Sequence, residues 1–319
     1  MSFLPLPAAS AVEPVLENGN DAVSGTLLKR FFCVLALGIA TAVHAEIVVT
    51  DDTGAKVRLA APARRIVSLA PHITETLFAA GAGDSVVGAV EYSDYPEAAK
   101  KLPRVGGYSK LDLEAVAALK PDLAVGWASG NTPAHIEKLR MLGIPVYLVQ
   151  PERIDDVAAN LERYGELAGT TTVARAAAAG FRNRLLELRA RYGARPPVRT
   201  FYQIWKQPLM TVGGGQVISH VIQLCGGVNV FADLKPLAPK VTVEAVIAAD
   251  PEVIVASGMG ESRPEWLADW RQWKTMTAVQ RDNLYFIPPD LIQRHTPRLT
   301  EGAARLCAQL ETARGKRGR

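Results

Sequence analysis

The sequence lacks the residue patterns by which several large enzyme classes are recognised. It contains no Gly-x-Ser-x-Gly and no His-Glu-x-x-His segment, which argues against a serine hydrolase and a zinc metalloprotease. The glycine run at residues 213–215 lacks the lysine and hydroxyl pair of a phosphate-binding loop. No two of the histidines beyond residue 45 are spaced i, i+4. We therefore expect neither catalytic residues nor a catalytic cofactor.

Strong charge and long apolar runs are also missing from the body of the chain. The net charge is only +4, with 48% hydrophobic and 21% charged residues among 319, which is typical of a soluble globular protein. No basic stripe is interleaved with aromatic residues, so nucleic acid is not expected as a partner. The basic residues at positions 314–319 are interpreted as a frayed end. The length suits two domains of ordinary size, and we expect a monomer.

Residues 27–45 have the pattern of a signal peptide. Lys29 and Arg30 precede an uncharged apolar stretch at residues 31–43, and small residues then occupy the −3 and −1 positions before Glu46. The stretch is about a dozen residues, whereas a membrane span needs roughly 20. The pattern predicts cleavage before Glu46 and a periplasmic protein; a membrane anchor is the alternative.

Only three cysteines are present, which agrees with export. Cys33 lies inside the predicted signal peptide, so Cys225 and Cys307 would be the cysteines of the mature chain. An even pair in an oxidising compartment suggests one disulfide, closing a loop of about 80 residues and contributing roughly 4 kcal/mol. Two buried free thiols are the alternative.

Short β-rich runs alternate with helical runs, which predicts an α/β protein with mostly parallel sheets covered by helices. The turn at residues 51–54 predicts an opening hairpin. Further strands are expected at 65–69, 85–90, 122–126, 145–149, 198–204, 253–256 and 284–287. Helices are expected at 74–80, 111–119, 133–142, 217–224, 243–249 and 298–312. An uninterrupted helix at 172–192 would be roughly 30 Å long. We predict a leader and upstream extension at 1–45, a first lobe at 46–170, a connecting helix at 171–194 and a second lobe at 195–319.

One segment occurs twice. Residues 113–123 (LEAVAALKPDL) match residues 243–253 (VEAVIAADPEV) at five identical positions, and both predict a helix, a proline break and a strand. The alternative is a helix–proline–strand pattern that arose independently twice within one α/β domain. We prefer two similar lobes joined by the long helix.

Aromatic and polar residues follow several predicted strands. Ligands of open parallel sheets bind beyond the carboxyl ends of the strands, where aromatic side chains can line a flat apolar ligand. The candidates at these ends and in nearby loops are Pro71, His72, Glu91, Tyr92, Asp94, Tyr108, Trp127, Trp205, Asp290, Arg294 and His295. Core packing is the alternative for any single aromatic residue.

Two further pairs place one member in each predicted lobe. His72 and His295 both follow strands and could approach a bound metal centre, although two partly exposed, hydrogen-bonded histidines are the alternative. Glu114 and Glu244 lie in the first turns of the repeated helices. They are interpreted as docking carboxylates for a transporter, the alternative being stabilisation by the helix dipole.

Several motifs together resemble one family of solute-binding proteins. The stretches are RIVSLAP at 65–71, YSDYP at 92–96, LKPDL at 119–123, LCGG at 224–227, and Pro297-Arg298 ahead of Leu306-Cys307. They are similar to the helical-backbone (class III) family that binds metal chelates, siderophores and haem. The YSDYP run and the cysteine pair narrow the resemblance to cobalamin binders of ABC-type importers.

The resemblance implies two α/β lobes bridged by one rigid helix, with cobalamin between the lobes and an ABC permease as partner. It implies that the first wall consists of Pro71, His72, Tyr92, Tyr108 and Trp127. It assigns polar contacts to Asp290 and Arg294, permease docking to Glu114 and Glu244, and the disulfide to Cys225 and Cys307.

The sequence departs from the family pattern at several wall positions. Tyr108 replaces a tryptophan, Ala238 and Leu291 replace aromatic residues, and His72 and His295 replace small ones. Trp205 or Met210 are candidates to compensate on the second wall. Haem or a ferric siderophore is therefore the alternative ligand. An enzyme acting on a tetrapyrrole and an interaction module without ligand are the rival classes.

Overall fold

The computed structural model describes residues 46–258 and 265–318. The contacts group residues His44–Arg319 into one compact unit. The predicted signal peptide and its cleavage point lie outside the described residues. No helix in the described ranges is long and apolar enough to cross a membrane.

The first lobe opens with the predicted hairpin, formed by β1 (Ile47–Thr50) and β2 (Lys56–Leu59). Its turn forms because one carboxylate oxygen of Asp51 accepts hydrogen bonds from the backbone and hydroxyl of Thr53 and from Ala55 N. A parallel sheet follows, with strand order β4-β3-β7-β8. Its strands are β3 (Ile66–Ser68), β4 (Val86–Ala89), β7 (Leu123–Trp127) and β8 (Val146–Val149).

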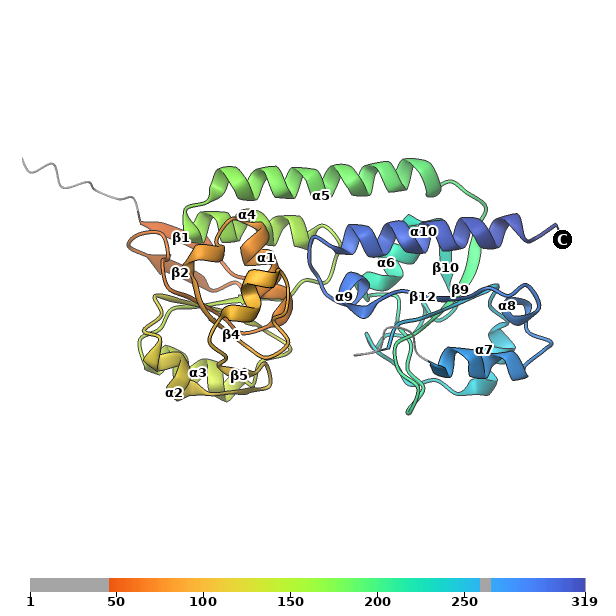
Figure 1. Cartoon of the computed structure of the whole chain (residues 1–319), viewed down its shortest axis with the longest axis horizontal. Coiled ribbons are helices and arrows are strands. Elements are labelled where there is room, and N and C mark those ends of the chain that lie inside the picture. Colours follow the sequence, from red (N-terminus) through yellow and green to blue (C-terminus); the bar gives the residue numbers. More distant parts are fainter. Residues whose placement is uncertain (1–45, 259–264, 319) are drawn as a thin grey trace, which may run out of the picture. The chain divides into compact units, whose positions relative to one another are not determined.

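Helices cover this sheet, as Figure 1 shows. They are α1 (Pro71–Ala79), α2 (Leu113–Ala118), α3 (Pro133–Met141) and α4 (Asp156–Ala168), with 3-10 turns η1 (Gly83–Ser85) and η2 (Glu97–Lys101) and a small hairpin of β5 (Gly106–Gly107) and β6 (Lys110–Leu111). Helix α4 was not predicted. Helix α1 begins at Pro71, three residues before the predicted start, because proline is well suited to the first helical position.

The predicted long helix is confirmed as α5 (Thr171–Tyr192). It runs alongside α4 of the first lobe and α10 of the second, and it connects the two sheets (Figure 1). The approach of α4 to α5 is close at Gly165, where an added Cβ would lie 2.3 Å from the Cβ of Ala174. Arg182 of α5 pairs with Glu162 of α4 at 2.6 Å.

The second lobe repeats the topology of the first. Its parallel sheet has the order β10-β9-β11-β12, so in both sheets the chain order of the strands is second, first, third, fourth. The strands are β9 (Val198–Gln203), β10 (Gly227–Asn229), β11 (Val253–Ala256) and β12 (Leu284–Phe286). The helices are α6 (Val217–Leu224), α7 (Val243–Ala249), α8 (Thr277–Gln280), α9 (Pro289–Ile292) and α10 (Leu299–Gly315), with a 3-10 segment η3 (Glu265–Gln272). The predicted fold class is thereby confirmed.

The duplicated segment has the same local structure in both lobes. In each copy a short helix, α2 or α7, leads through a proline into the third strand of its sheet. The residue before each proline has a left-handed backbone, with φ of 46° at Lys120 and 36° at Asp250. The residue after each proline donates its backbone N–H to a carbonyl oxygen next to or within the first strand of the parallel sheet. Asp122 donates to Arg65, and Glu252 donates to Arg199. The shared backbone conformation and hydrogen bond favour a duplicated lobe over a chance similarity of two helix–proline–strand segments.

The predicted disulfide between Cys225 and Cys307 is present and joins the end of α6 to α10. The basic C-terminus was interpreted as a frayed end, and this is wrong for the described residues 314–318. Helix α10 extends through Arg314, whose buried guanidinium donates to the carbonyls of Pro196, Cys225 and Gly226. These backbone acceptors hold the last turn against the disulfide corner.

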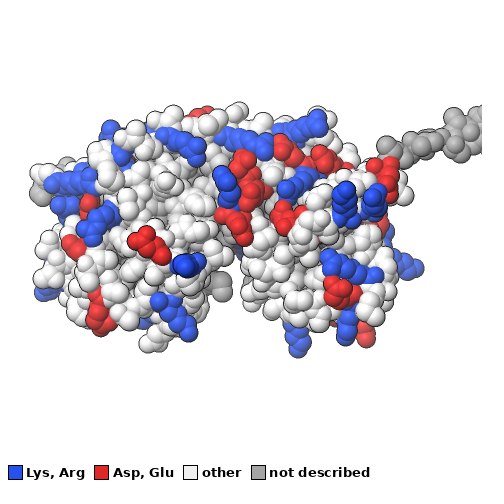
Figure 2. Space-filling view, turned by 180° about the vertical axis from the view of Figure 1, so that it is seen from behind, with Lys and Arg blue, Asp and Glu red and all other residues white. Residues whose placement is uncertain are grey.

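Side chains of both signs are interspersed, rather than sorted by sign, on one face of the molecule (Figure 2). On the face seen in Figure 2, Lys and Arg side chains lie close to Asp and Glu side chains along the edge formed by α5. Among the described residues, the α5 arginines Arg182 and Arg184 have carboxylate partners. This distribution agrees with the small net charge of +4.

Candidate ligand-binding site

The carboxyl ends of the first sheet carry a row of aromatic side chains. His72 stands at the start of α1 directly after β3, Trp127 is the last residue of β7, and Tyr108 lies in the turn between β5 and β6. The ring of Trp127 is 5.2 Å from that of His72 and 5.9 Å from that of Tyr108. The predicted recurrence of aromatic residues at strand ends therefore corresponds to one contiguous surface.

The row extends to the second lobe through histidine. His295 follows α9, and its ring centroid is 6.3 Å from that of His72. The two imidazoles, separated by more than 200 positions in the sequence, thus meet between the lobes (Figure 1 shows α1 and α9 facing each other). Their predicted approach to a bound metal centre stays a prediction.

Asn131, which follows the predicted strand at 122–126, holds the aromatic row in place, and the sequence analysis assigned it no role in the site. Its side chain accepts from Trp127 N at 2.6 Å and donates to the carbonyl oxygens of Tyr108 and Leu69 at 2.7 and 2.9 Å. Gly130 allows the same turn to lie against the indole, because a Cβ there would be 1.9 Å from Trp127 Cε3. The position of Asn131 four residues after a strand-end tryptophan was the available signal.

Tyr92 is far more exposed than the residues of the aromatic row. It has a left-handed backbone with φ of 63°, and its side chain is 73% exposed. The loop is fixed by the next residue, since the buried hydroxyls of Ser93, Thr74 and Ser68 are linked at 2.9 and 2.8 Å. Core packing is therefore not the role of Tyr92, and the exposure of Tyr108 (41%) and Trp205 (42%) excludes it for them as well.

The predicted polar contacts of the second lobe form an ion-pair group. The guanidinium of Arg294 lies 3.0 Å from Asp290 and 2.8 Å from Asp94, which belongs to the first lobe. Although burial alone would raise it, the hydrogen bond and charge of Arg294 hold the pKa of Asp94 below its ordinary value. Arg294 therefore contacts both lobes at the edge of the aromatic row.

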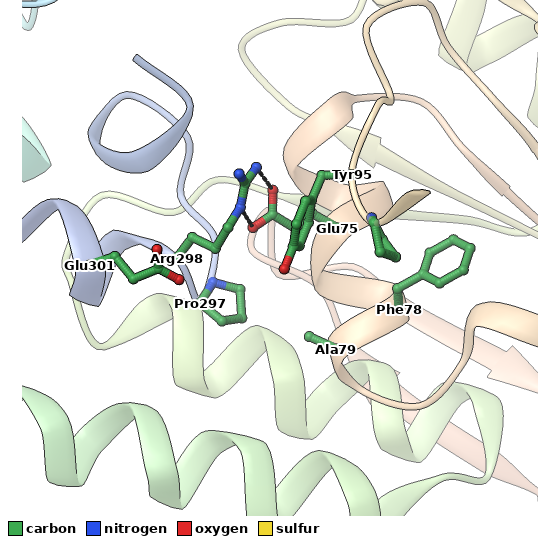
Figure 3. Close-up of a pocket in the computed structure, with 8 residues that line it drawn as sticks. Glu75, Phe78, Ala79, Tyr95, Pro297, Arg298 and Glu301 are labelled. Carbon is green, nitrogen blue, oxygen red and sulfur yellow. Dashed lines mark hydrogen bonds and ion pairs between the residues drawn. The ribbon is translucent and has the colours of Figure 1, made fainter. Parts of the chain in front are cut away.

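A second interlobe pair lies closer to the connecting helix. Arg298 donates to both carboxylate oxygens of Glu75, at 2.8 and 2.6 Å, and its guanidinium lies 3.8 Å from the ring centre of Tyr95. These groups border a cavity of about 420 Å³, which Figure 3 shows between α1 and the start of α10. The remaining lining residues are Phe78, Ala79, Pro96, Pro297 and Glu301.

Burial makes both interlobe histidines weak bases. Burial first, and then the positive charges of His295 and Arg294, lower the pKa of His72 to about 3. Burial lowers the pKa of His295 to about 4 against the opposing charge of Asp156. Both rings are consequently neutral at pH 7, and neutral imidazole is the form that coordinates metals.

The remaining predicted residues make no ring contact with this row within the described ranges, and Pro71 directly precedes His72. Trp205 follows β9, and its indole N–H donates to the carbonyl of Gln207 at 2.9 Å; within the described ranges it makes no ring contact with the row. Pro71 is the first residue of α1. Glu114 and Glu244 are exposed in the first turns of α2 and α7, one in each lobe. A backbone hydrogen bond and Thr242 lower the pKa of Glu244.

The fold and the site define a two-lobed binding protein, and comparison with known proteins agrees. The sequence profile of the periplasmic binding protein family matches residues 66–291, and the chain belongs to that family. It is similar to the vitamin B12-binding protein of Vibrio cholerae serotype O1, with 40% identity over 253 residues that cover 79% of this chain and 91% of the relative.

Solved structures show the same likeness. The crystal structure of the periplasmic vitamin B12-binding protein BtuF of Vibrio cholerae matches with a TM-score of 0.73 and 39% identity, covering 79% of this chain and 98% of that one. A periplasmic heme-binding protein from Pseudomonas aeruginosa matches with a TM-score of 0.68 and 26% identity over 77% of this chain and 92% of that one. The prediction of a binding protein rather than an enzyme is confirmed by this family.

Proposed function

We propose that this chain captures cobalamin or a related corrinoid between its lobes in the periplasm and delivers it to an ABC-type permease of the inner membrane. The observation that carries the proposal is the row Tyr108, Trp127 and His72 at the carboxyl ends of the first sheet. A flat macrocycle suits such a row, because aromatic faces bury its apolar surface while a few polar groups orient it. The 40% identity to a vitamin B12-binding protein supports this ligand class.

Titration calorimetry of the chain beginning at Glu46 with cyanocobalamin tests the proposal. We expect a dissociation constant in the micromolar range or lower. At a hundredfold excess over that constant, the ligand would stabilise the fold by about 2.7 kcal/mol through mass action. Absence of both heat and thermal protection would refute cobalamin capture.

Variants locate the binding surface. Trp127→Ala removes the central ring of the row, so we expect at least a tenfold loss of affinity, equivalent to about 1.4 kcal/mol. Trp273→Ala is the matched control, because Trp273 is a 37% exposed tryptophan outside the row. Equal affinities of the two variants would contradict this location of the site.

For permease docking we propose Glu114 and Glu244, one exposed carboxylate on each lobe. The double variant Glu114→Lys and Glu244→Lys should reduce uptake by cells while leaving ligand affinity unchanged. The double variant Glu137→Lys and Glu187→Lys makes the same change in net charge at two other exposed side chains, 63% and 64% exposed, and serves as the control. If uptake and ligand binding fall together, the docking role is wrong.

Export and the oligomeric state complete the proposal. We infer cleavage by signal peptidase before Glu46 and a monomer in solution. Mass spectrometry of the chain recovered from the periplasm should give an N-terminus at Glu46, and light scattering should give the mass of one chain.

Haem is the second candidate ligand, favoured by the neutral buried His72 at the end of the aromatic row. Haemin added to the protein should then show a Soret shift that is absent in His72→Ala. A calorimetric competition in which haemin displaces no cyanocobalamin would exclude haem from the proposed site.

A further inference from the structure

His72 is an unusual histidine for a protein interior. Its side chain is only 8% exposed, and its Nε2 is buried with no hydrogen-bond partner among residues 46–258 and 265–318. A buried polar atom without a partner destabilises the folded state, because it has lost its hydrogen bond to water. An atom left in this condition beside a ligand site is a candidate for contact with the ligand.

The surroundings of His72 hold its ring toward the space between the lobes. The imidazole lies edge-on to Trp127, and His295 of the second lobe is its neighbour on the interlobe side, at 6.3 Å between ring centres. The backbone of His72 is fixed because its carbonyl accepts a hydrogen bond from the hydroxyl of Thr76 at 2.8 Å within α1. A ligand that enters between the lobes would therefore contact the His72 ring on the side that His295 occupies in this structure.

A free metal ion does not suit this arrangement. Structural metal sites use four protein ligands and catalytic zinc sites use three, and no group of three or more His, Cys, Asp or Glu residues that could hold a metal occurs in the described part of the chain. A metal carried by a macrocycle already has in-plane nitrogen ligands and needs only an axial donor from the protein, as in haem proteins. One unpartnered imidazole is sufficient for that role.

We propose that His72 is an axial ligand to the cobalt of corrinoids that have an exchangeable axial position, such as cobinamides, which lack the lower nucleotide base. In this step the Nε2 lone pair forms a bond to cobalt while a cobalt-bound water leaves, and the oxidation state of the metal does not change. Nδ1 keeps its proton, so no proton is released. This inference rests on the proposed function and specifies a substrate class for the same site.

The neutral state of the ring supports the exchange. Because burial lowers the pKa of His72 to about 3, the ring is neutral at pH 7, and its Nδ1–H tautomer offers the Nε2 lone pair for coordination. The facing groups are the imidazole of His295, neutral at that pH, and the guanidinium of Arg294. Of these two groups, the charged guanidinium of Arg294 disfavours an imidazolium at position 72 at pH 7.

Titration of the protein with diaquocobinamide, followed by visible absorption, tests the proposal. We expect the cobinamide bands to move to the positions that free imidazole produces with cobinamide in buffer. In His72→Ala the shift should be lost and affinity should fall at least tenfold, and millimolar imidazole added to this variant should restore the shift. His295→Ala should keep the shift.

Controls make each outcome decisive. His72→Gln preserves most of the side-chain volume, so it replaces His72→Ala if the latter has lost its native circular dichroism. An unshifted spectrum of bound cobinamide, or a shift that persists in both His72 variants, would overturn the proposal. A His72-dependent shift with haemin but not with cobinamide would overturn the corrinoid assignment.

Cyanocobalamin separates this inference from the proposed function, because cyanide and its own base already occupy both axial positions. If cyanocobalamin binds but cobinamide shows no imidazole-type shift, His72 is not a ligand and corrinoid capture stands. If neither corrinoid binds, the proposed function itself has failed.

Discussion

The two lobes have the same strand order but present different chemistry at the ends of their strands. The first sheet ends in aromatic rings, with Trp127 and Tyr108 in contact. The second sheet is followed by Asp290 and Arg294, which form an ion pair, and the disulfide joins two helices of this lobe, α6 and α10. A duplicated scaffold thus fixes where side chains appear in space, while the residues at those places determine what each lobe can recognise.

The disulfide offers the largest test of this asymmetry. Replacing Cys225 and Cys307 by Ser opens a loop with a sequence separation of 82, and the chain-entropy model gives a loss of roughly 4–5 kcal/mol. We expect scanning calorimetry to show a lower-temperature transition for the second lobe, with the first lobe unfolding separately. A single transition that moves as a whole would instead mean that the lobes unfold cooperatively.

The interlobe pair of Glu75 and Arg298 comes next. The Glu75 side chain is only 2% exposed, so Arg298→Met would leave a buried carboxylate without its cation and should reduce stability by about 3–5 kcal/mol. Urea denaturation measures the change. Arg271→Met is the control, because its ion pair with Asp282 is exposed and such pairs contribute at most about 1 kcal/mol. Similar losses in both variants would show that Glu75 is solvated when its partner is removed.

Acid should destabilise the interlobe contact through its histidines. The folded pKa values of about 3 for His72 and about 4 for His295 lie below the ordinary value of 6.5, so the unfolded chain binds more protons in this window. Stability is fully present above about pH 6.5 and falls as the pH decreases, by about 1.4 kcal/mol per pH unit for each histidine. Between pH 6.5 and 5 each contributes a loss of about 2 kcal/mol.

Thermal or urea unfolding at a series of pH values measures this slope. His72→Gln and His295→Gln should each flatten it, since each removes one titrating group. His220→Gln on α6 is the control for replacing a histidine as such. An unchanged slope in both interlobe variants would mean that these rings titrate normally.

The smallest expected difference concerns the two copies of the repeat. Asp112 caps α2 by accepting hydrogen bonds from the backbone of Glu114 and Ala115, whereas Thr242 caps α7 through a single bond from Ala245 N at 3.2 Å. Loss of a cap costs about 0.5–2 kcal/mol. We expect Asp112→Ala to fall in the upper half of that range and Thr242→Ala in the lower half, measured by urea denaturation. The reverse order would show that the copies differ by more than their caps.

Much of the fold could be predicted because local patterns determine it. Helices α6 and α7 and strand β11 have the predicted bounds, since apolar residues and flanking Gly or Pro mark their ends. Helix α4 was missed because its buried face includes Asn160 and Gly165, which interrupt an apolar pattern. Strand β10, with three residues, is too short for periodicity to reveal.

The site was predictable only in part, for a related reason. That aromatic residues follow strands is visible locally, and Trp127 was selected in this way, whereas Tyr108 was selected as a residue of a predicted loop. The contacts between the lobes join residues about 200 positions apart, as Arg294 to Asp94 and Arg298 to Glu75 do. Such contacts depend on how two complete sheets are placed by α5, which no local pattern contains.

Trp127 gives the first lobe an optical property of its own. Of the five tryptophans, it is the one that precedes α5, and it touches both Tyr108 and His72. Replacing the other four by phenylalanine would leave a single fluorophore in the aromatic row. Its emission would then report occupancy of the row through energy transfer to any bound chromophore, without a label and independently of the second lobe.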